Sequence, residues 1–141
     1  ARMLAFQLEA DSRGIRIDLA ISGKPTISGS HGLIERAVDN LLSNAIKFSA
    51  DGGRIEVAVS QTAGSAEIAI RDHGPGVPVD DLPNLFRPFF RGANASRAEG
   101  HGLGLAIVER VVRAHGGALT AANAQGRGLL VRISLPGSTA G

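Results

Sequence analysis

Glycines alternate at positions 100, 102 and 104, where the segment GHGLGL runs directly into an amphipathic helical pattern. Glycine lowers helix stability by roughly 0.5–1 kcal/mol relative to alanine, so repeated glycines at a helix start need a reason. A helix N-terminus exposes unpaired N–H groups and carries partial positive charge, which suits a phosphate. Without Cβ atoms, these positions let phosphate oxygens approach closely. The pattern predicts a phosphate seat, with a flexible hinge as the purely structural alternative.

A polar face runs along residues 31–48, between apolar pairs that recur every four residues. Asn40, Asn44 and Lys47 are spaced i, i+4 and i+7, so they share that face of a helix. Asparagine is a poor helix former and has no intrinsic reason to recur there. Amide oxygens beside one cation suit a magnesium ion and the phosphate that it bridges. An ordinary solvated face is the alternative.

The segment RDHGPGVP, residues 71–78, follows an alternating strand pattern directly. Its turn-forming residues fit a tight turn. They also fit a binding function, because Gly74 and Gly76 would let the backbone approach a flat ligand while Asp72 accepts a hydrogen bond. An adenine amino group is a suitable donor.

These side chains need elements to position them, and hydrophobic periodicity predicts those elements. Strands are expected at 14–22, 26–28, 54–60, 66–71, 117–123 and 128–135, and helices at 31–48 and 102–114. The first strand is expected to be half-buried, with Ile15, Ile17, Leu19 and Ile21 on its inner side. Residues 72–101 lose periodicity and predict a functional loop. The order favours an α/β (α+β) two-layer sandwich: a mixed, mostly antiparallel sheet of about five strands with about three helices on one face.

Composition narrows the class further. The 141 residues fit one domain, here 14–136, preceded by the end of a linker helix (1–13) and followed by a tail (137–141). The absence of cysteine excludes disulfides and cysteine-ligated zinc. No apolar run approaches the ~20 residues that cross a bilayer. Scattered basic residues and 4% aromatic residues do not indicate nucleic-acid binding.

Taken in order, the motifs resemble the catalytic ATP-binding domain (HATPase_c, GHKL superfamily) of bacterial two-component sensor histidine kinases. That superfamily also includes gyrase, Hsp90 and MutL and has the Bergerat fold. The matching segments are DNLLSNAIKF (39–48), DHGPG (72–76), FRPFFR (86–91), GHGLGL (100–105) and, more weakly, GRG (126–128). The short lid and the sequence FRPFFRG are most similar to those of EnvZ- or CpxA-type membrane kinases.

The resemblance implies a role for each matched residue. Asn40 would coordinate Mg²⁺, with Asn44 and Lys47 facing the ion and the triphosphate of ATP. The phosphates would be cradled by a segment consisting of Gly100, His101, Gly102, Leu103, Gly104 and Leu105.

At the other end of the nucleotide, Asp72 would bond the adenine amino group. Phe48 would flank the nucleotide, and Gly74 and Gly76 would shape the pocket.

Residues 77–101 would form an ATP lid that orders around nucleotide. Phe86 and Phe89 would anchor this lid by packing against the domain. Arg91 would reach the γ-phosphate and, with Lys47, neutralise charge during transfer.

A phosphate acceptor is missing from this chain. Its histidines are each followed by glycine, and none lies in the H-[ED]-x-x-x-P motif of the phosphoacceptor helix: His31, His73, His101 and His115. The resemblance therefore implies a phosphodonor domain acting on the separate dimerisation and phosphoacceptor domain of its parent, with a response regulator downstream. We expect a monomeric fragment of a homodimeric inner-membrane sensor, lying on the cytoplasmic side.

One departure concerns hydrolysis. Hydrolytic relatives place a water-activating glutamate four residues before the first asparagine, where this chain has Arg36. Glu35 lies one position away, rotated about 100° around a helix. We therefore expect slow ATP hydrolysis. The alternatives are an anti-sigma-type serine kinase, an ATP-driven clamp of the gyrase type, and a nucleotide sensor without transfer activity.

Overall fold

The computed structural model describes residues 10–23, 31–49, 51–62, 64–84, 86, 104–124 and 128–137 of the chain. Its elements are β1 (Arg16–Ser22), α2 (His31–Phe48), β2 (Arg54–Thr62), β3 (Ser65–Arg71), a 3₁₀ helix η1 (Val79–Asn84), α3 (Gly104–Ala114), β4 (Ala118–Asn123) and β5 (Leu129–Pro136). Residues 10–12 are also helical.

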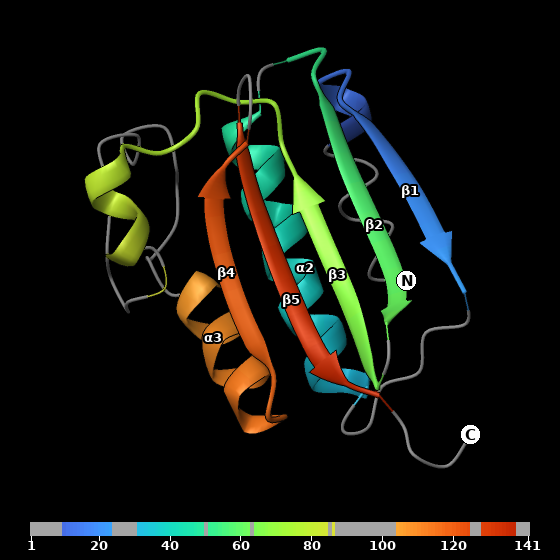
Figure 1. Ribbon diagram of the computed structural model, residues 1–141. Coiled ribbons are helices and arrows are strands. Elements are labelled where there is room, and N and C mark those ends of the chain that lie inside the picture. Colours follow the sequence, from blue (N-terminus) through green and yellow to red (C-terminus); the bar gives the residue numbers. More distant parts are fainter. Residues whose placement is uncertain are drawn as a thin grey trace.

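The strands form one five-stranded sheet in the order β1-β2-β3-β5-β4 (Figure 1). β1 pairs with β2 in parallel, with α2 between them in the chain, and the other three pairings are antiparallel. The hairpin of β2 and β3 is joined to the hairpin of β4 and β5 through the β3–β5 pairing. The expected mixed, mostly antiparallel sheet is confirmed.

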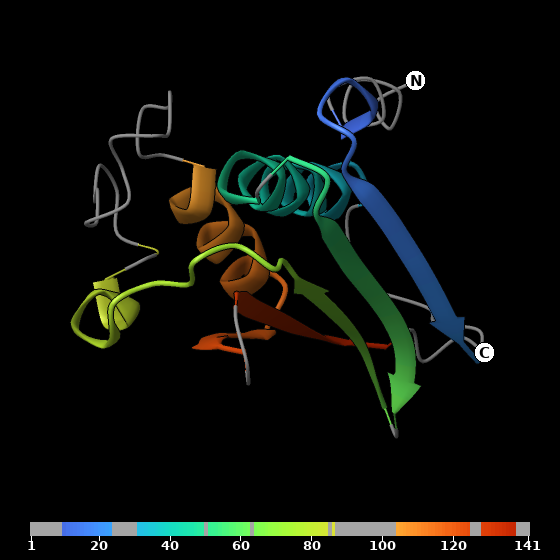
Figure 2. The same cartoon turned by 90° about the horizontal axis from the view of Figure 1, so that it is seen from above.

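The core lies between one face of this sheet and the pair α2 and α3, which lie side by side on it (Figure 2). Both helices contribute apolar stripes because their apolar residues recur at helical spacing. The largest fully buried side chains are Ile46, Ile55, Ile133, Leu135, Val108 and Val112. The two-layer sandwich predicted from periodicity is therefore the observed architecture.

Two expectations need correction. Ile15 is buried and Ile17 partly so, but Leu19 is 58% and Ile21 62% exposed. The first strand is thus half-buried only in its first part, because edge strand β1 starts beside α2 and then diverges from it (Figure 2). The loop expected at 72–101 contains the 3₁₀ helix η1, and the strand expected at 26–28 lies outside the described residues.

In the described ranges, no helix is both long and apolar enough to span a membrane.

Candidate functional site

Asp72 follows β3 directly and is held by the neighbouring strand β5. Its side chain is buried at 4% exposure. Oδ1 accepts hydrogen bonds from the backbone N–H groups of Gly74 at 3.0 Å and Leu129 at 3.1 Å. The backbone N–H of Asp72 donates to the carbonyl oxygen of Leu129, also at 3.1 Å. The carboxylate therefore has a set orientation before any ligand binds.

Burial raises the pKa of Asp72 above its ordinary value, because desolvation disfavours the charged form. The two backbone N–H donors and the nearby charges of His73 and Arg71 act in the opposite direction. Both hydrogen bonds from described residues use Oδ1. Oδ2 is consequently the oxygen left to accept a bond from a ligand.

Gly128 supports this carboxylate from the turn between β4 and β5. Its φ is +102°, and a Cβ there would lie 1.9 Å from the carbonyl oxygen of Asp72. No side chain fits at that distance, so glycine is required for the two backbones to touch. This contact gives a physical reason for the last glycine of the GRG segment at 126–128. Residues 126 and 127 lie outside the described residues.

Asn123, at the end of β4, was not expected to belong to the site. Its side-chain oxygen accepts from the backbone N–H of Val77 at 2.8 Å, and its side-chain nitrogen donates to the carbonyl oxygen of Val77 at 2.7 Å. Gly76, with a φ of +79°, lies directly against the same amide. Sequence reasoning treats an asparagine before a turn as a turn former, so no local signal distinguishes Asn123.

The polar face expected on the first long helix is present on α2. Asn40, Asn44 and Lys47 are all partly buried. Among the described residues, the side-chain amides of Asn40 and Asn44 have no hydrogen-bond partner. Lys47 lies in the last turn of α2. Figure 1 shows that this end of α2 and the end of β3, from which Asp72 follows, are at the same end of the sheet.

The last turn of α2 is fastened by Arg13. The guanidinium donates to the carbonyl oxygens of Ile46 and Ser49, and Nε forms an ion pair with Asp51 at 2.7 Å. The carbonyl oxygen of Ile46 also accepts from the backbone N–H of Ser49 at 3.3 Å, and the helix dipole favours a cation at this C-terminus. Arg13 therefore stabilises the helical turn that carries Lys47.

The glycine-rich segment is described only at its end. α3 begins at Gly104, and Leu105 packs partly against the core. In Figure 2 the start of α3 lies beside α2, on the side away from the sheet. Outside the described residues are Arg91, Gly100, His101, Gly102 and Leu103, together with the side chain of Phe48.

The segment expected to form the lid starts with Val77, which packs against the core together with Leu82 of η1. Phe86 also packs partly against the core, as expected of a lid anchor. Phe89 lies outside the described residues.

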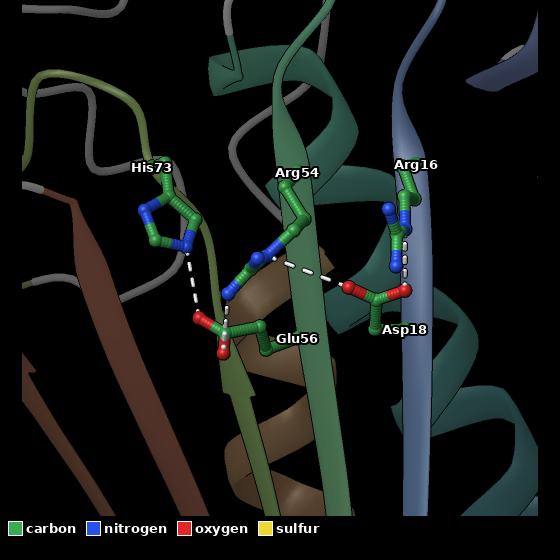
Figure 3. Close-up of polar contacts among 5 residues, drawn as sticks. All are labelled: Arg16, Asp18, Arg54, Glu56 and His73. Carbon is green, nitrogen blue, oxygen red and sulfur yellow. Dashed lines mark hydrogen bonds and ion pairs between the residues drawn. The ribbon is translucent and has the colours of Figure 1, made fainter.

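His73 does not join the site. Its Nε2 lies 2.8 Å from Oε2 of Glu56 on the open face of the sheet, where Glu56 also pairs with Arg54 and Arg54 with Asp18 (Figure 3). The pKa of Glu56 is lowered, chiefly by the hydrogen bond to His73. Successive residues of an extended chain face opposite sides, so Asp72 and His73 serve different surfaces.

Comparison with known proteins identifies the family of this domain. Residues 29–139 match the family described as histidine kinase-, DNA gyrase B-, and HSP90-like ATPase, and the chain belongs to that family.

Similar proteins include sensor kinases. The chain is 37% identical to the sensor protein CutS of Streptomyces coelicolor over 91% of its length and 31% of CutS. It is 40% identical to the signal transduction histidine-protein kinase/phosphatase MprB of Mycobacterium tuberculosis over 87% of its length and 25% of MprB. The chain thus spans about a quarter to a third of these curated relatives.

Solved structures agree with the fold. A structure of the mycobacterial sensor histidine kinase MprB matches with a TM-score of 0.83 and 38% identity, covering 96% of this chain and 93% of that one. The catalytic domain of histidine kinase ThkA matches with a TM-score of 0.85 at 21% identity, covering 96% and 88% of the two chains, and supports the fold alone.

Proposed function

We propose that this domain binds Mg-ATP and donates the γ-phosphate to a histidine on a separate dimerisation and phosphoacceptor domain of its parent protein. That histidine would pass the phosphate to a response regulator. Family membership and the sensor kinases among its relatives support this function. In this proposal residues 14–136 are the catalytic domain of a homodimeric, membrane-bound sensor and lie on the cytoplasmic side, and the fragment alone is a monomer.

The buried carboxylate of Asp72 is the observation that carries the adenine end of the site. Two backbone N–H groups hold Oδ1, which leaves Oδ2 to accept a hydrogen bond from a ligand. An adenine amino group is a donor and matches it. A buried acceptor also rejects a ligand that lacks this donor, because the acceptor would then be left unsatisfied.

The polar face of α2 fits the metal and phosphate end. Asn40 and Asn44 supply amide oxygens of the kind that Mg²⁺ accepts, and their amides have no partner among the described residues. Lys47 adds positive charge one turn later. When bound, the ion would supply charge neutralisation for the transferred phosphoryl group.

The remaining assignments belong to this proposal by resemblance alone. Arg91 would contact the γ-phosphate, and the N–H groups of residues 100–105 would hold the phosphate chain. Phe48 would flank the nucleotide. With these groups the domain positions ATP and neutralises its charge, and the acceptor histidine comes from another domain.

A binding titration tests this function. A non-hydrolysable ATP analogue is titrated with and without Mg²⁺ against wild type, Asn40→Ala and a surface control, Arg113→Ala, whose side chain is 76% exposed on α3. We expect Mg²⁺ to tighten binding in wild type and in the control but not in Asn40→Ala. Equal binding under all conditions would contradict the metal role of Asn40, and no binding at all would contradict the function.

The same samples address hydrolysis. Arg36 stands where a hydrolytic relative has its glutamate and is exposed on α2. The purified domain should therefore turn over ATP slowly. Brisk turnover in a contaminant-free sample would favour the clamp-ATPase alternative.

A further inference from the structure

We infer that Asn123 is a positioning residue for nucleotide binding, holding the start of the lid segment through the backbone of Val77. This inference rests on the proposed function. No sequence motif points to Asn123, and it lies outside every segment matched by the resemblance.

The geometry is that of a two-point clamp. The amide of Asn123 uses both of its polar atoms on one residue, accepting from the N–H of Val77 at 2.8 Å and donating to its carbonyl oxygen at 2.7 Å. The side-chain amide thus makes the same two hydrogen bonds to Val77 that the backbone of a neighbouring strand would make. The two residues are 46 positions apart, so the contact joins β4 to the segment that follows β3.

Gly76 shows how closely the clamp fits. A Cβ at Gly76 would lie 2.8 Å from Oδ1 of Asn123, which is closer than side-chain carbon atoms approach such an oxygen. The φ of +79° at Gly76 also disfavours any other residue. A side chain at position 76 would therefore displace the amide and release Val77.

The clamp is one of two contacts that hold residues 72–77, the segment proposed to bind the nucleotide. Gly128 touches the backbone of Asp72 at one end of this segment, and Asn123 holds Val77 at the other. Both contacts come from the hairpin of β4 and β5, and the backbone N–H of Ala124 donates to the carbonyl oxygen of Gly128 at 2.8 Å. The hairpin turn thus sets the position of the segment from both ends.

Because Asn123 is exposed, its effect on nucleotide binding can be measured apart from an effect on the stability of the fold. Asn123 is exposed and contributes nothing to the apolar core. Its two hydrogen bonds hold the backbone of Val77, where the expected lid segment starts. Loss of the clamp should therefore weaken nucleotide binding, which requires an ordered lid, more than it weakens the folded domain.

The first test compares Asn123→Ala with Thr120→Ala, a matched control at another exposed position of β4. The readouts are affinity for a non-hydrolysable ATP analogue with Mg²⁺ and the urea midpoint of unfolding without nucleotide. We expect Asn123→Ala to bind about five- to tenfold more weakly with a nearly unchanged midpoint. Thr120→Ala should behave as wild type.

The second test uses Asn123→Asp, which is isosteric. When ionised, its carboxylate offers only acceptors and opposes the carbonyl oxygen of Val77. When protonated, it donates to that oxygen and accepts from the N–H, as asparagine does. Because an ordinary aspartate titrates at about pH 4, the affinity of Asn123→Asp relative to wild type should rise as pH falls from about 6 to about 4. The ratio to wild type at each pH cancels the titration of Asp72, and the ratio for Asn123→Ala should stay flat.

Wild-type affinity in Asn123→Ala would overturn the clamp while leaving the proposed function intact. So would a pH-independent ratio for Asn123→Asp, or a loss of affinity fully explained by a lower unfolding midpoint. Failure of wild type itself to bind the analogue would overturn both.

Discussion

Asp72 and Leu129, separated by 57 positions in the chain, are joined by two hydrogen bonds of 3.1 Å: one between their backbones and one from the N–H of Leu129 to the carboxylate. The side chain proposed to bind adenine is therefore oriented by β5 as well as by the neighbouring Gly74. Substitutions in the hairpin of β4 and β5 should consequently change nucleotide affinity even where the substituted residue does not contact the nucleotide.

The contact between Gly128 and Asp72 predicts a large effect of Gly128→Ala. The added Cβ would lie 1.9 Å from the carbonyl oxygen of Asp72, at a φ of +102°. We expect the free energy of unfolding to fall by about 3 kcal/mol or more, measured by urea denaturation.

Gly52→Ala is the matched control, because Gly52 also has a positive φ (+76°) but nothing lies within 4 Å of its Cβ position. In Gly52→Ala only the strain of the positive φ should lower the free energy of unfolding, by about 1 kcal/mol. Similar losses in the two variants would show that the close approach of Gly128 to Asp72 is unimportant.

The buried carboxylate predicts a gain in stability for Asp72→Asn. The amide keeps an oxygen for the N–H groups of Gly74 and Leu129 and removes the desolvated charge. Because the folded-state pKa of Asp72 is raised, the folded protein keeps this proton to higher pH than the unfolded chain does. Its contribution to stability therefore falls as pH rises from the ordinary aspartate value of 3.8 through the raised pKa, and is constant above it.

Urea unfolding at a series of pH values checks this sign. The difference in unfolding free energy, Asp72→Asn minus wild type, should increase with pH across that window and then level off. Nucleotide affinity should move the other way, falling more than about tenfold in Asp72→Asn because an amide N–H would face the adenine amino group. A variant that is more stable and still binds normally would remove Asp72 from the adenine site.

The hydrogen bonds of Arg13 at the end of α2 predict that replacing this residue lowers stability. Arg13→Ala leaves the carbonyl oxygens of Ile46 and Ser49 without their cationic donor, and we expect a loss of about 1–3 kcal/mol in unfolding free energy. Arg13→Lys should recover part of it, since an ammonium lacks the fork of a guanidinium.

Arg16→Ala provides the comparison for Arg13. The side chain of Arg16 is 73% exposed and pairs with Asp18 at 2.8 Å, an arrangement worth about 0–1 kcal/mol. Equal losses from Arg13→Ala and Arg16→Ala in urea denaturation would mean that the guanidinium of Arg13 acts only as a surface charge.

Local periodicity was sufficient for most elements. The helix at 31–48 has the predicted bounds, and the strands expected at 54–60 and 66–71 are observed as Arg54–Thr62 and Ser65–Arg71. These assignments depend on near neighbours, whose spacing of two or 3.6 residues is visible in the chain. The same spacing places Asn40, Asn44 and Lys47 on one face of α2.

Exposure along β1 depended on how far the helices reach. Leu19 and Ile21 have the alternation of buried residues, yet both are exposed on this edge strand, which diverges from α2 (Figure 2). Alternation predicts which side a residue faces, but not whether another layer covers that side.

The amino-acid sequence by itself determined the helices, most of the strands and the family, and it predicted the residues that a nucleotide would need. All of these depend on short-range spacing and residue type. Only the tertiary structure decided that β5 orients Asp72, that Gly128 must lack a side chain, that Asn123 holds Val77 and that Arg13 holds α2. Each of those contacts joins residues distant in the chain, so it exists only once the strands have paired and the helices have packed.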